Sequence, residues 1–240
     1  GSFATVWRVQ DGHEEIGRAQ VEGEVRVVAL ASRPADLLAV GTAAKVVLVS
    51  LPDLQQVAEL EHCSRVNDLS FSPDGARLAV GAGTDDMCGL MTKKASMHSM
   101  NAVIWSVSAV GTGCRCLGSI AFDNIVHVTA FSPSGALLAV SGETCAIDIL
   151  YAGGAFENIS ELPTAAGVLC LAWSPDSALL ASGGEDMQVL VWDIVTEEII
   201  CQLPKQTDWL CGISFGVDCS LLASCCFESS GVTLYPMEVQ

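Results

Sequence analysis

Short apolar runs separated by turn residues recur along almost the whole chain. The clearest stretch, "LAWSPDSALLASGGEDMQVLVWDI" from Leu171 to Ile194, contains three apolar runs and two turns rich in Ser, Pro, Asp and Gly. Runs of this kind, bounded by such residues, are typical of short β-strands joined by tight turns. The pattern therefore predicts an all-β fold.

The same pattern returns at a nearly constant interval. Four further copies are "ALASRPADLLAVGTA" from Ala29, "LSFSPDGARLAVGAG" from Leu69, "TAFSPSGALLAVSGE" from Thr129 and "ISFGVDCSLLASCCF" from Ile213. One alanine in the second run of each copy serves to align the copies. These alanines are Ala39, Ala79, Ala139, Ala181 and Ala223, and they are separated by 40, 60, 42 and 42 positions. A period of about 40 to 45 residues is that of β-propeller blades.

Each full copy divides into four runs, as a four-stranded blade requires. In the fourth copy we expect strands at 168–173, 179–184, 188–194 and 197–203. The inner runs are apolar and suit burial between neighbouring blades, whereas "EEIICQL" mixes polar with apolar residues, as an outer edge strand does. In the second copy, "SPDG" at Ser72–Gly75 predicts a hairpin turn.

The chain reads as a single β-propeller domain, 1–240, of about five four-stranded blades. Counting the runs gives 21 strands, with a partial blade at each end. Either the N-terminal strands complete the last blade imperfectly or the chain is a piece of a larger propeller, and we expect the piece. Its predicted parts are 1–23 (a partial blade), 24–61, 62–122 (with an insertion at 84–100), 123–163, 164–204 and 205–240 (a partial blade).

These residues resemble the WD-repeat β-propeller family. "LASGGEDMQVLVWDI" is similar to the family's second strand, turn and third strand, and "LPKQTDWLCGISF" to its entry into a blade. The resemblance covers almost the whole chain and implies a propeller of the type that usually closes with seven blades. Because propellers carry many unrelated functions, it implies little about activity beyond an interaction scaffold.

The family often braces a blade with a buried set of His, Ser or Thr, Asp and Trp. The fourth copy matches with Ser182, Asp186 and Trp192, but Thr164 stands in place of the histidine. Buried polar groups need hydrogen-bond partners. We therefore expect Asp186 to bond to backbone or to Ser182.

The second copy has the other half of this set. His62 and Trp105 are present, and Val80 and Thr84 occupy the remaining two places. The resemblance therefore implies structural roles for His62 and Trp105.

The charge balance bears on the class of partner. The chain has 11 Lys and Arg against 28 Asp and Glu, a formal net charge of −17. This excess repels nucleic acid and anionic lipid and favours a basic protein segment. Half the residues are hydrophobic, and no membrane span or signal peptide is recognised. We expect a soluble cytoplasmic protein, with the nucleus as the alternative, that belongs to a larger chain or complex.

Cysteine usage predicts reduced thiols rather than disulfides or zinc ligands. The eleven cysteines include no C-x-x-C pair, which a structural zinc site would require. Cysteines in apolar strands behave as small hydrophobic residues. Those that we expect to be packed in strands are Cys145, Cys170, Cys201, Cys211 and Cys225.

No catalytic set is recognised, and we predict neither an enzyme nor a cofactor or metal. The chain contains none of the sequence motifs of a nucleophile elbow, a phosphate loop, a zinc protease or a dinucleotide site. The four histidines, His13, His62, His98 and His127, are scattered over different copies. We expect His127, inside an apolar strand, to be a satisfied core residue.

The insertion is the candidate binding site. It reads "TDDMCGLMTKKASMHSM", lies between the second and third strands of its copy, and holds four of the six methionines. Met-rich surfaces adapt to varied partners. Two alternatives stay open: a segment that covers the propeller's own apolar surface, and a soft-metal or small-ligand site that uses Met, Cys88 and His98.

The resemblance implies that the insertion shares one face with the residues just before each blade. Those residues are Arg65, Ile125, Gly167 and Trp209. The predicted partner-binding residues are Met87, Cys88, Leu90, Met91, Lys93, Lys94, Met97, His98, Arg65 and Trp209.

Overall fold

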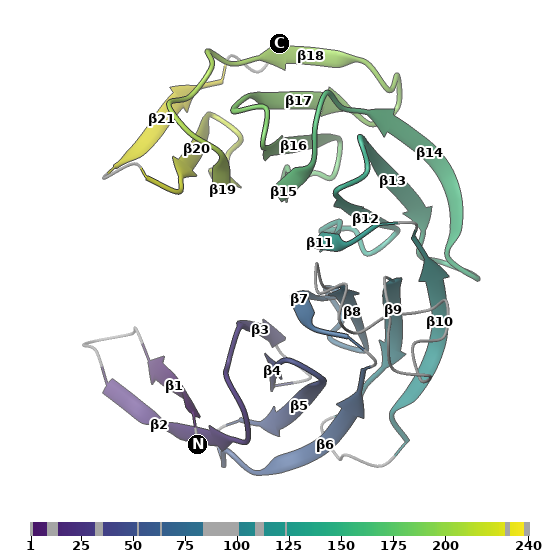
Figure 1. The fold of residues 1–240 in the computed structure, drawn as a ribbon, viewed down its shortest axis with the longest axis vertical. Coiled ribbons are helices and arrows are strands. Elements are labelled where there is room, and N and C mark those ends of the chain that lie inside the picture. The colour runs from purple at the N-terminus through teal and green to yellow at the C-terminus, as the bar shows by residue number, and fades with distance from the viewer. Residues whose placement is uncertain are drawn as a thin grey trace, which may run out of the picture. The chain divides into compact units, whose positions relative to one another are not determined.

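The structure is a computed structural model of 21 β-strands grouped into antiparallel sheets (Figure 1). It describes residues 2–8, 14–31, 36–51, 53–62, 64–83, 101–108, 113–122, 124–228 and 231–237. No helix occurs in these ranges. The chain forms two compact units, unit 1 (residues 1–122) and unit 2 (residues 123–240).

Unit 1 contains one two-stranded and two four-stranded sheets. The first pairs β1 (Ser2–Arg8) with β2 (Glu14–Val21). The second has the order β3 (Val27–Ala31), β4 (Leu37–Gly41), β5 (Lys45–Ser50), β6 (Gln56–Glu61). The third has the order β7 (Val66–Phe71), β8 (Arg77–Ala82), β9 (Asn101–Ser106), β10 (Arg115–Ala121).

Unit 2 contains two four-stranded sheets and a three-stranded one. The first has the order β11 (Val126–Phe131), β12 (Leu137–Gly142), β13 (Ala146–Tyr151), β14 (Glu157–Pro163). The second has the order β15 (Val168–Trp173), β16 (Leu179–Gly184), β17 (Val189–Asp193), β18 (Ile199–Gln202). The third has the order β19 (Leu210–Phe215), β20 (Leu221–Cys226), β21 (Val232–Pro236).

The core of each unit lies between the faces of neighbouring sheets. In the four-stranded sheets the middle strands are buried on both faces, as in β4, where all five residues are buried, whereas outer strands such as β18 are largely exposed. One cluster in unit 2 joins Ile149 of one sheet to Leu180 and Trp192 of the next. Both faces of a middle strand are covered by apolar neighbours, and this explains why those runs are uniformly apolar in sequence.

Tight turns close the hairpins where the Ser-Pro dipeptides occur. In the turn after β7, Gly75 N donates to Ser72 O at 2.8 Å, and Ser72 N donates to Arg77 O at 2.9 Å. Gly75 has φ of +66°, a left-handed conformation that glycine adopts without steric cost. The hairpin predicted at "SPDG" is confirmed.

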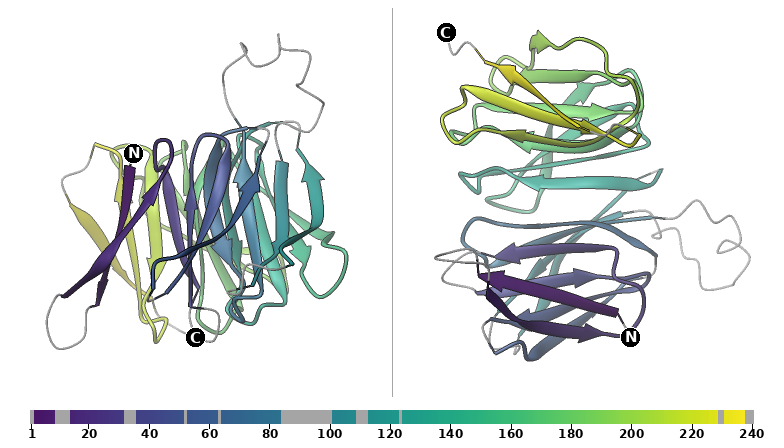
Figure 2. Two further views of the ribbon diagram at one scale, coloured as in Figure 1. Left: turned by 90° about the horizontal axis from the view of Figure 1, so that it is seen from below. Right: turned by 90° about the vertical axis from the view of Figure 1, so that its left-hand side faces the viewer.

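The all-β fold class with four-stranded blades is confirmed. Within each unit the connecting turns collect at the two ends of the sheets (Figure 2). Among the described residues, no helix has the length and apolar character that a membrane crossing needs. The assignment of the whole chain to a single domain, with its blade boundaries, stays a prediction.

Candidate functional site

One end of the sheets in each unit is held together by a repeated backbone hydrogen bond. The residue that follows the second strand of a sheet donates its N–H to the carbonyl of the residue just before the first strand. The pairs are Gly83 to Arg65 (3.0 Å), Glu143 to Ile125 (3.1 Å), Glu185 to Gly167 (3.0 Å) and Phe227 to Trp209 (3.1 Å). We call this end the loop face of each unit.

Glycine at the end of the second strand permits this close approach. A Cβ on Gly184 would lie 2.0 Å from the carbonyl oxygen of Gly167, and one on Gly142 would lie 1.8 Å from that of Ile125. Any side chain there would push the two segments apart. In these two sheets the backbone contact leaves room only for glycine, whereas Ala82 and Cys226 end the second strand where the same bond forms in the sheets of β8 and β20.

The insertion leaves unit 1 from this loop face. Its predicted binding residues between 84 and 100 lie outside the described residues, but the residue before it, Gly83, is anchored on both sides. Gly83 N bonds to Arg65 O, and Asn67 Nδ2 donates to Gly83 O at 3.1 Å. Arg65 in turn donates from Nε to Asn67 Oδ1 at 3.0 Å. Arg65 and the root of the insertion are therefore neighbours.

The four residues expected on this face differ in accessibility. Ile125 and Gly167 are buried and contribute only backbone. Arg65 is half-buried in unit 1, and Trp209, in unit 2, keeps 45% of its surface exposed. Of these four, Arg65 and Trp209 can therefore offer a side chain to a partner.

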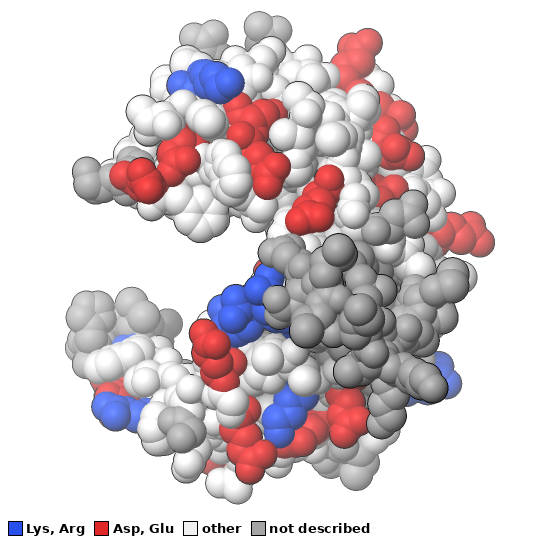
Figure 3. All heavy atoms as spheres, in the orientation of Figure 1, with Lys and Arg blue, Asp and Glu red and all other residues white. Residues whose placement is uncertain are grey.

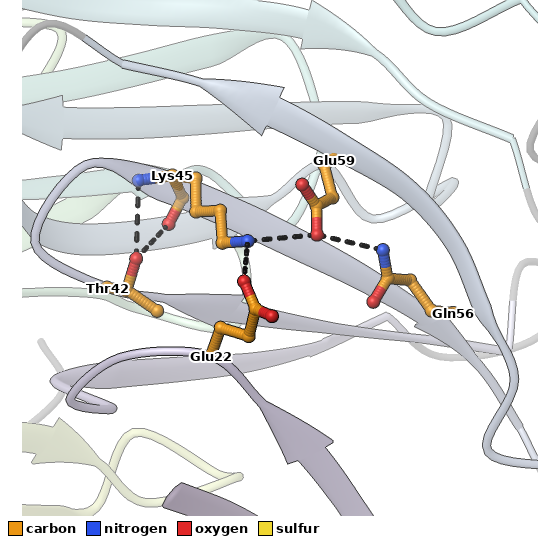
Figure 4. A network of polar contacts seen from close by, with 5 residues as sticks. All are labelled: Glu22, Thr42, Lys45, Gln56 and Glu59. Carbon is orange, nitrogen blue, oxygen red and sulfur yellow. Dashed lines mark hydrogen bonds and ion pairs between the residues drawn. The ribbon is translucent and has the colours of Figure 1, made fainter. Parts of the chain in front are cut away.

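A charged network that the sequence did not reveal lies in unit 1 (Figure 4). Lys45 Nζ is 3.0 Å from Glu59 Oε1 and 3.6 Å from Glu22 Oε2, and Gln56 Nε2 donates to the same Glu59 oxygen at 2.9 Å. These hydrogen bonds raise the pKa of Lys45 and lower the pKa of Glu59. Thr42 Oγ1 donates to Lys45 O at 2.9 Å and closes the turn before β5. Lys45 and Glu59 come together because β5 pairs with β6, and Glu22 reaches Lys45 from the segment after β2, so no local motif marks the network.

An open hollow of about 480 Å³ adjoins this network. Two carboxylates and one ammonium group line it, so its charge is negative while its histidine is neutral. Such a surface favours a cationic group. The lining residues are Glu22, Gly23, Thr42, Ala43, Ala44, Lys45, Glu61 and His62.

Negative charge is concentrated in unit 2. Residues 123–240 contain 15 Asp and Glu but a single cation, Lys205, which gives a formal charge of −14. On the face that Figure 3 shows, acidic side chains accordingly outnumber basic ones in this unit. Trp209 is exposed here beside Asp208, which accepts a hydrogen bond from Glu228 N at 3.1 Å.

The bracing residues of the fourth copy lie together at the end of β16. Trp192 Nε1 donates to Ser182 Oγ at 2.9 Å. Asp186 Oδ1 accepts a hydrogen bond from the backbone N–H of Gln188 at 3.1 Å. Beside them, Thr164 lines a pocket of about 10 Å³, about the size that one water molecule needs. The space that a histidine would fill is therefore nearly closed.

His62 and Trp105 contact each other without a hydrogen bond. Their rings meet edge to face with centroids 6.0 Å apart, and neither His62 Nε2 nor Trp105 Nε1 has a partner within the described ranges. Burial lowers the pKa of His62 to about 4. The ring is therefore neutral at physiological pH, as part of the packing of unit 1.

The expectation of packed cysteines is correct only in part. Cys170 is buried, and Cys201 and Cys225 are half-buried, but Cys145 and Cys211 are exposed. Cys145 lies in the turn before β13 rather than inside a strand, and Cys211 lies at a bulge of β19. His127 is half-buried, with Nε2 4.0 Å from Glu143 Oε1, and is not a core residue.

The soft-metal hypothesis depends on residues that the structure does not describe. Cys88 and His98, its proposed ligands, lie in the insertion. Elsewhere, in the described part of the chain, no group of three His, Cys, Asp or Glu side chains is arranged to hold a metal ion.

Comparison with known proteins places both units in one class. A family model described as "WD domain, G-beta repeat" matches residues 156–193, and one described as "Anaphase-promoting complex subunit 4 WD40 domain" matches residues 31–108. The first match covers β17, with Trp192, and the second covers β4 to β6, which carry Lys45, Gln56 and Glu59 of the network.

Curated relatives agree with these matches. "WD repeat-containing protein 1" of Gallus gallus is 27% identical over 70% of this chain and 26% of its own length, and that of Bos taurus is 29% identical over 67% and 25%. A Caenorhabditis elegans "WD repeat-containing protein 20 homolog" is 35% identical over 20% of this chain and 6% of its own length. The matched region spans about a quarter of the length of the first two relatives. Together with the four-stranded sheets and the repeat, these matches support a WD-repeat family for this chain.

Proposed function

We propose that this chain is a non-catalytic scaffold that binds a protein or peptide partner through the loop faces of its units. WD-repeat proteins generally act as scaffolds for protein interactions. We also propose a cytoplasmic location.

The observation that carries the proposal is the combination of charge and an exposed aromatic residue in unit 2. Trp209 is an exposed side chain on a unit that carries 15 acidic residues and one lysine. Tryptophan is enriched where interfaces bury area. The acidic surroundings favour a partner segment with basic side chains and steer its approach.

Unit 1 supports the same class of partner. The insertion, 84–100, leaves the loop face beside Arg65, and the hollow beside Lys45 is negatively charged. The methionines and lysines of the insertion would then provide an adaptable arm at this face.

Selection from a random peptide display library tests the proposal. We expect the selected peptides to carry net positive charge and to bind more weakly as salt rises from 50 to 500 mM, because their attraction is screened. Trp209→Ala should weaken binding, and replacement of 84–100 by a short Gly and Asn turn should change which peptides are selected.

Val217→Ala is the matched control, since Val217 is 94% exposed in the turn between β19 and β20, at the end opposite the loop face. Selection of acidic peptides would contradict the proposal. So would basic peptides that bind all three variants equally.

A further inference from the structure

Two thiols meet at an irregularity of the last sheet. Register shifts between Leu210 and Gly212 of β19, so that Leu210 pairs with Cys226 and Gly212 with Cys225, while Cys211 is the extra residue of a β-bulge. Cys211 Sγ lies 3.6 Å from Cys225 Sγ and 3.6 Å from Cys225 O. At this bulge the two side chains are therefore in contact across β19 and β20.

Gly212 makes room for this contact. A Cβ at Gly212 would lie 2.9 Å from Cys225 Sγ, and Cys225 Sγ donates to Gly212 O at 3.8 Å. The missing side chain therefore leaves the space in which the Cys225 thiol rests against Cys211.

Accessibility separates this pair from the neighbouring thiols. Cys211 is exposed and Cys225 half-buried, whereas Cys170 and Cys226 are buried. A dissolved oxidant can reach Cys211, and the second thiol is already in contact with it. Reactive cysteines combine access with a nearby resolving cysteine in this way.

We propose that Cys211 and Cys225 form a redox modification site that hydrogen peroxide converts into a disulfide between β19 and β20. Neither the partner-binding proposal nor the family membership is needed for this site. Its failure would therefore leave the proposed function untouched.

The chemistry proceeds in two steps. The Cys211 thiolate attacks one oxygen of hydrogen peroxide, a sulfur–oxygen bond forms, the oxygen–oxygen bond breaks, and the released hydroxide takes up a proton to become water. The Cys225 thiolate then attacks the sulfur of the resulting sulfenic acid, and hydroxide leaves and is protonated. In total, two thiols lose two electrons and two protons, and one peroxide becomes two waters.

Burial and the neighbouring thiols set the rate of the first step. Burial, the hydrogen bond with Cys225 and the nearby Cys226 raise the pKa of Cys211, and Cys170 on β15 is a further thiol within electrostatic reach. Because the thiolate is the nucleophile, we expect oxidation at pH 7 to be slow and its rate to rise about tenfold per pH unit up to the pKa.

The site lies at the loop-face end of its sheet. Cys211 follows Trp209 by two positions, Cys225 precedes Phe227 by two, and Phe227 N bonds to Trp209 O. A disulfide between them would hold β19 and β20 together beside the exposed tryptophan.

Peptide mapping of the peroxide-treated full chain tests the site. The protein is oxidised at pH 8, free thiols are alkylated, and the digest is analysed without reduction. Trypsin leaves Cys211, Cys219, Cys225 and Cys226 in one peptide because no Lys or Arg follows Lys205. Chymotrypsin, which can cut after Phe215 and Leu222, separates Cys211 from Cys219 and from the pair Cys225 and Cys226.

We expect a Cys211–Cys225 linked peptide that is lost in Cys211→Ser and in Cys225→Ser. In Cys225→Ser, dimedone should trap the sulfenic acid on Cys211. Cys226→Ser should still form the link, and Cys145→Ser, at an exposed cysteine away from the pair, should form it at the unmodified rate. Gly212→Ala should slow it, because the added methyl group displaces the Cys225 thiol.

Three results would overturn the proposal. One is a link that joins Cys211 to Cys170 or Cys226 instead of Cys225. Another is a Cys211 that accumulates as sulfinic acid with no link to Cys225. The third is a link that forms equally fast in urea-unfolded chains, since this would show that the folded geometry contributes nothing.

Discussion

Trp192 donates a hydrogen bond from its indole nitrogen to the hydroxyl of Ser182, 2.9 Å away on the neighbouring strand. Both side chains are buried. In this sheet Leu180 pairs with Trp192, and in unit 1 Leu78 pairs in the same way with Trp105. The residue two positions after Leu78 is Val80, so Trp105 meets an apolar side chain where Trp192 meets a hydroxyl.

Ser182→Ala should lower the free energy of unfolding by about 1 to 3 kcal/mol, because it leaves the Trp192 N–H buried without an acceptor. Chemical denaturation followed by circular dichroism measures this change. Ser214→Ala, at an exposed position of β19, is the control and should change stability by less than about 0.5 kcal/mol. Equal effects of the two substitutions would show that the indole bond contributes nothing.

Val80→Thr should restore an acceptor for Trp105. The reference variant for stability is Val40→Thr, at the equivalent, fully buried position of β4. There the neighbouring side chains include Val47 and Val49, which offer no hydrogen-bond donor. A threonine hydroxyl without a partner costs about 1 to 3 kcal/mol. Val80→Thr should therefore be more stable than Val40→Thr by about that amount. A Val40→Thr chain that is the more stable of the two would contradict the placement of residue 80 beside the Trp105 indole.

Stability should fall between pH 7.5 and pH 5 because of His62. Its pKa in the folded chain is about 4, below the value of about 6.5 that an unfolded histidine has. Between these values the unfolded chain binds a proton that the folded chain does not, so acid favours unfolding. The expected loss by pH 5 is about 2 kcal/mol.

Urea titrations at several pH values measure this loss, and His62→Gln is the variant that should remove it. Four aspartates, Asp74, Asp176, Asp193 and Asp218, have their pKa lowered by hydrogen bonds to their carboxylates. These aspartates lower the stability of the fold only as the pH falls further, when their carboxylates become protonated. The measurement therefore stops at pH 5. An undiminished pH dependence in His62→Gln would rule out this histidine as its source.

Gly184→Ala should destabilise unit 2 by about 3 kcal/mol, because the new methyl group would meet the Gly167 carbonyl oxygen 2.0 Å away. Gly231→Ala is the matched control, since a Cβ there meets nothing within 4 Å. Thermal unfolding compares the two. Similar melting temperatures for both variants would show that the loop face tolerates separation of its segments.

The sequence alone determined the strands, their grouping in fours and the turns between them. Strand β16 and the turn at Ser72 were predicted because run length and turn residues are local properties. The positions of Ser182 and Trp192 on facing strands followed from comparison of the copies, because a repeated pattern carries a repeated register.

Only the tertiary structure decided which of these side chains reach solvent and which meet each other. The alternation of side chains along a strand shows which residues share a face, but a neighbouring sheet decides whether that face is covered. Cys211 and Cys170 both lie in apolar first strands, yet Cys211 is exposed and Cys170 buried. The bulge at which Cys211 meets Cys225 depends on how β19 pairs with β20, and the Lys45 contact with Glu22 joins β5 to the segment that follows β2. Such contacts arise from long-range packing, which no local pattern encodes.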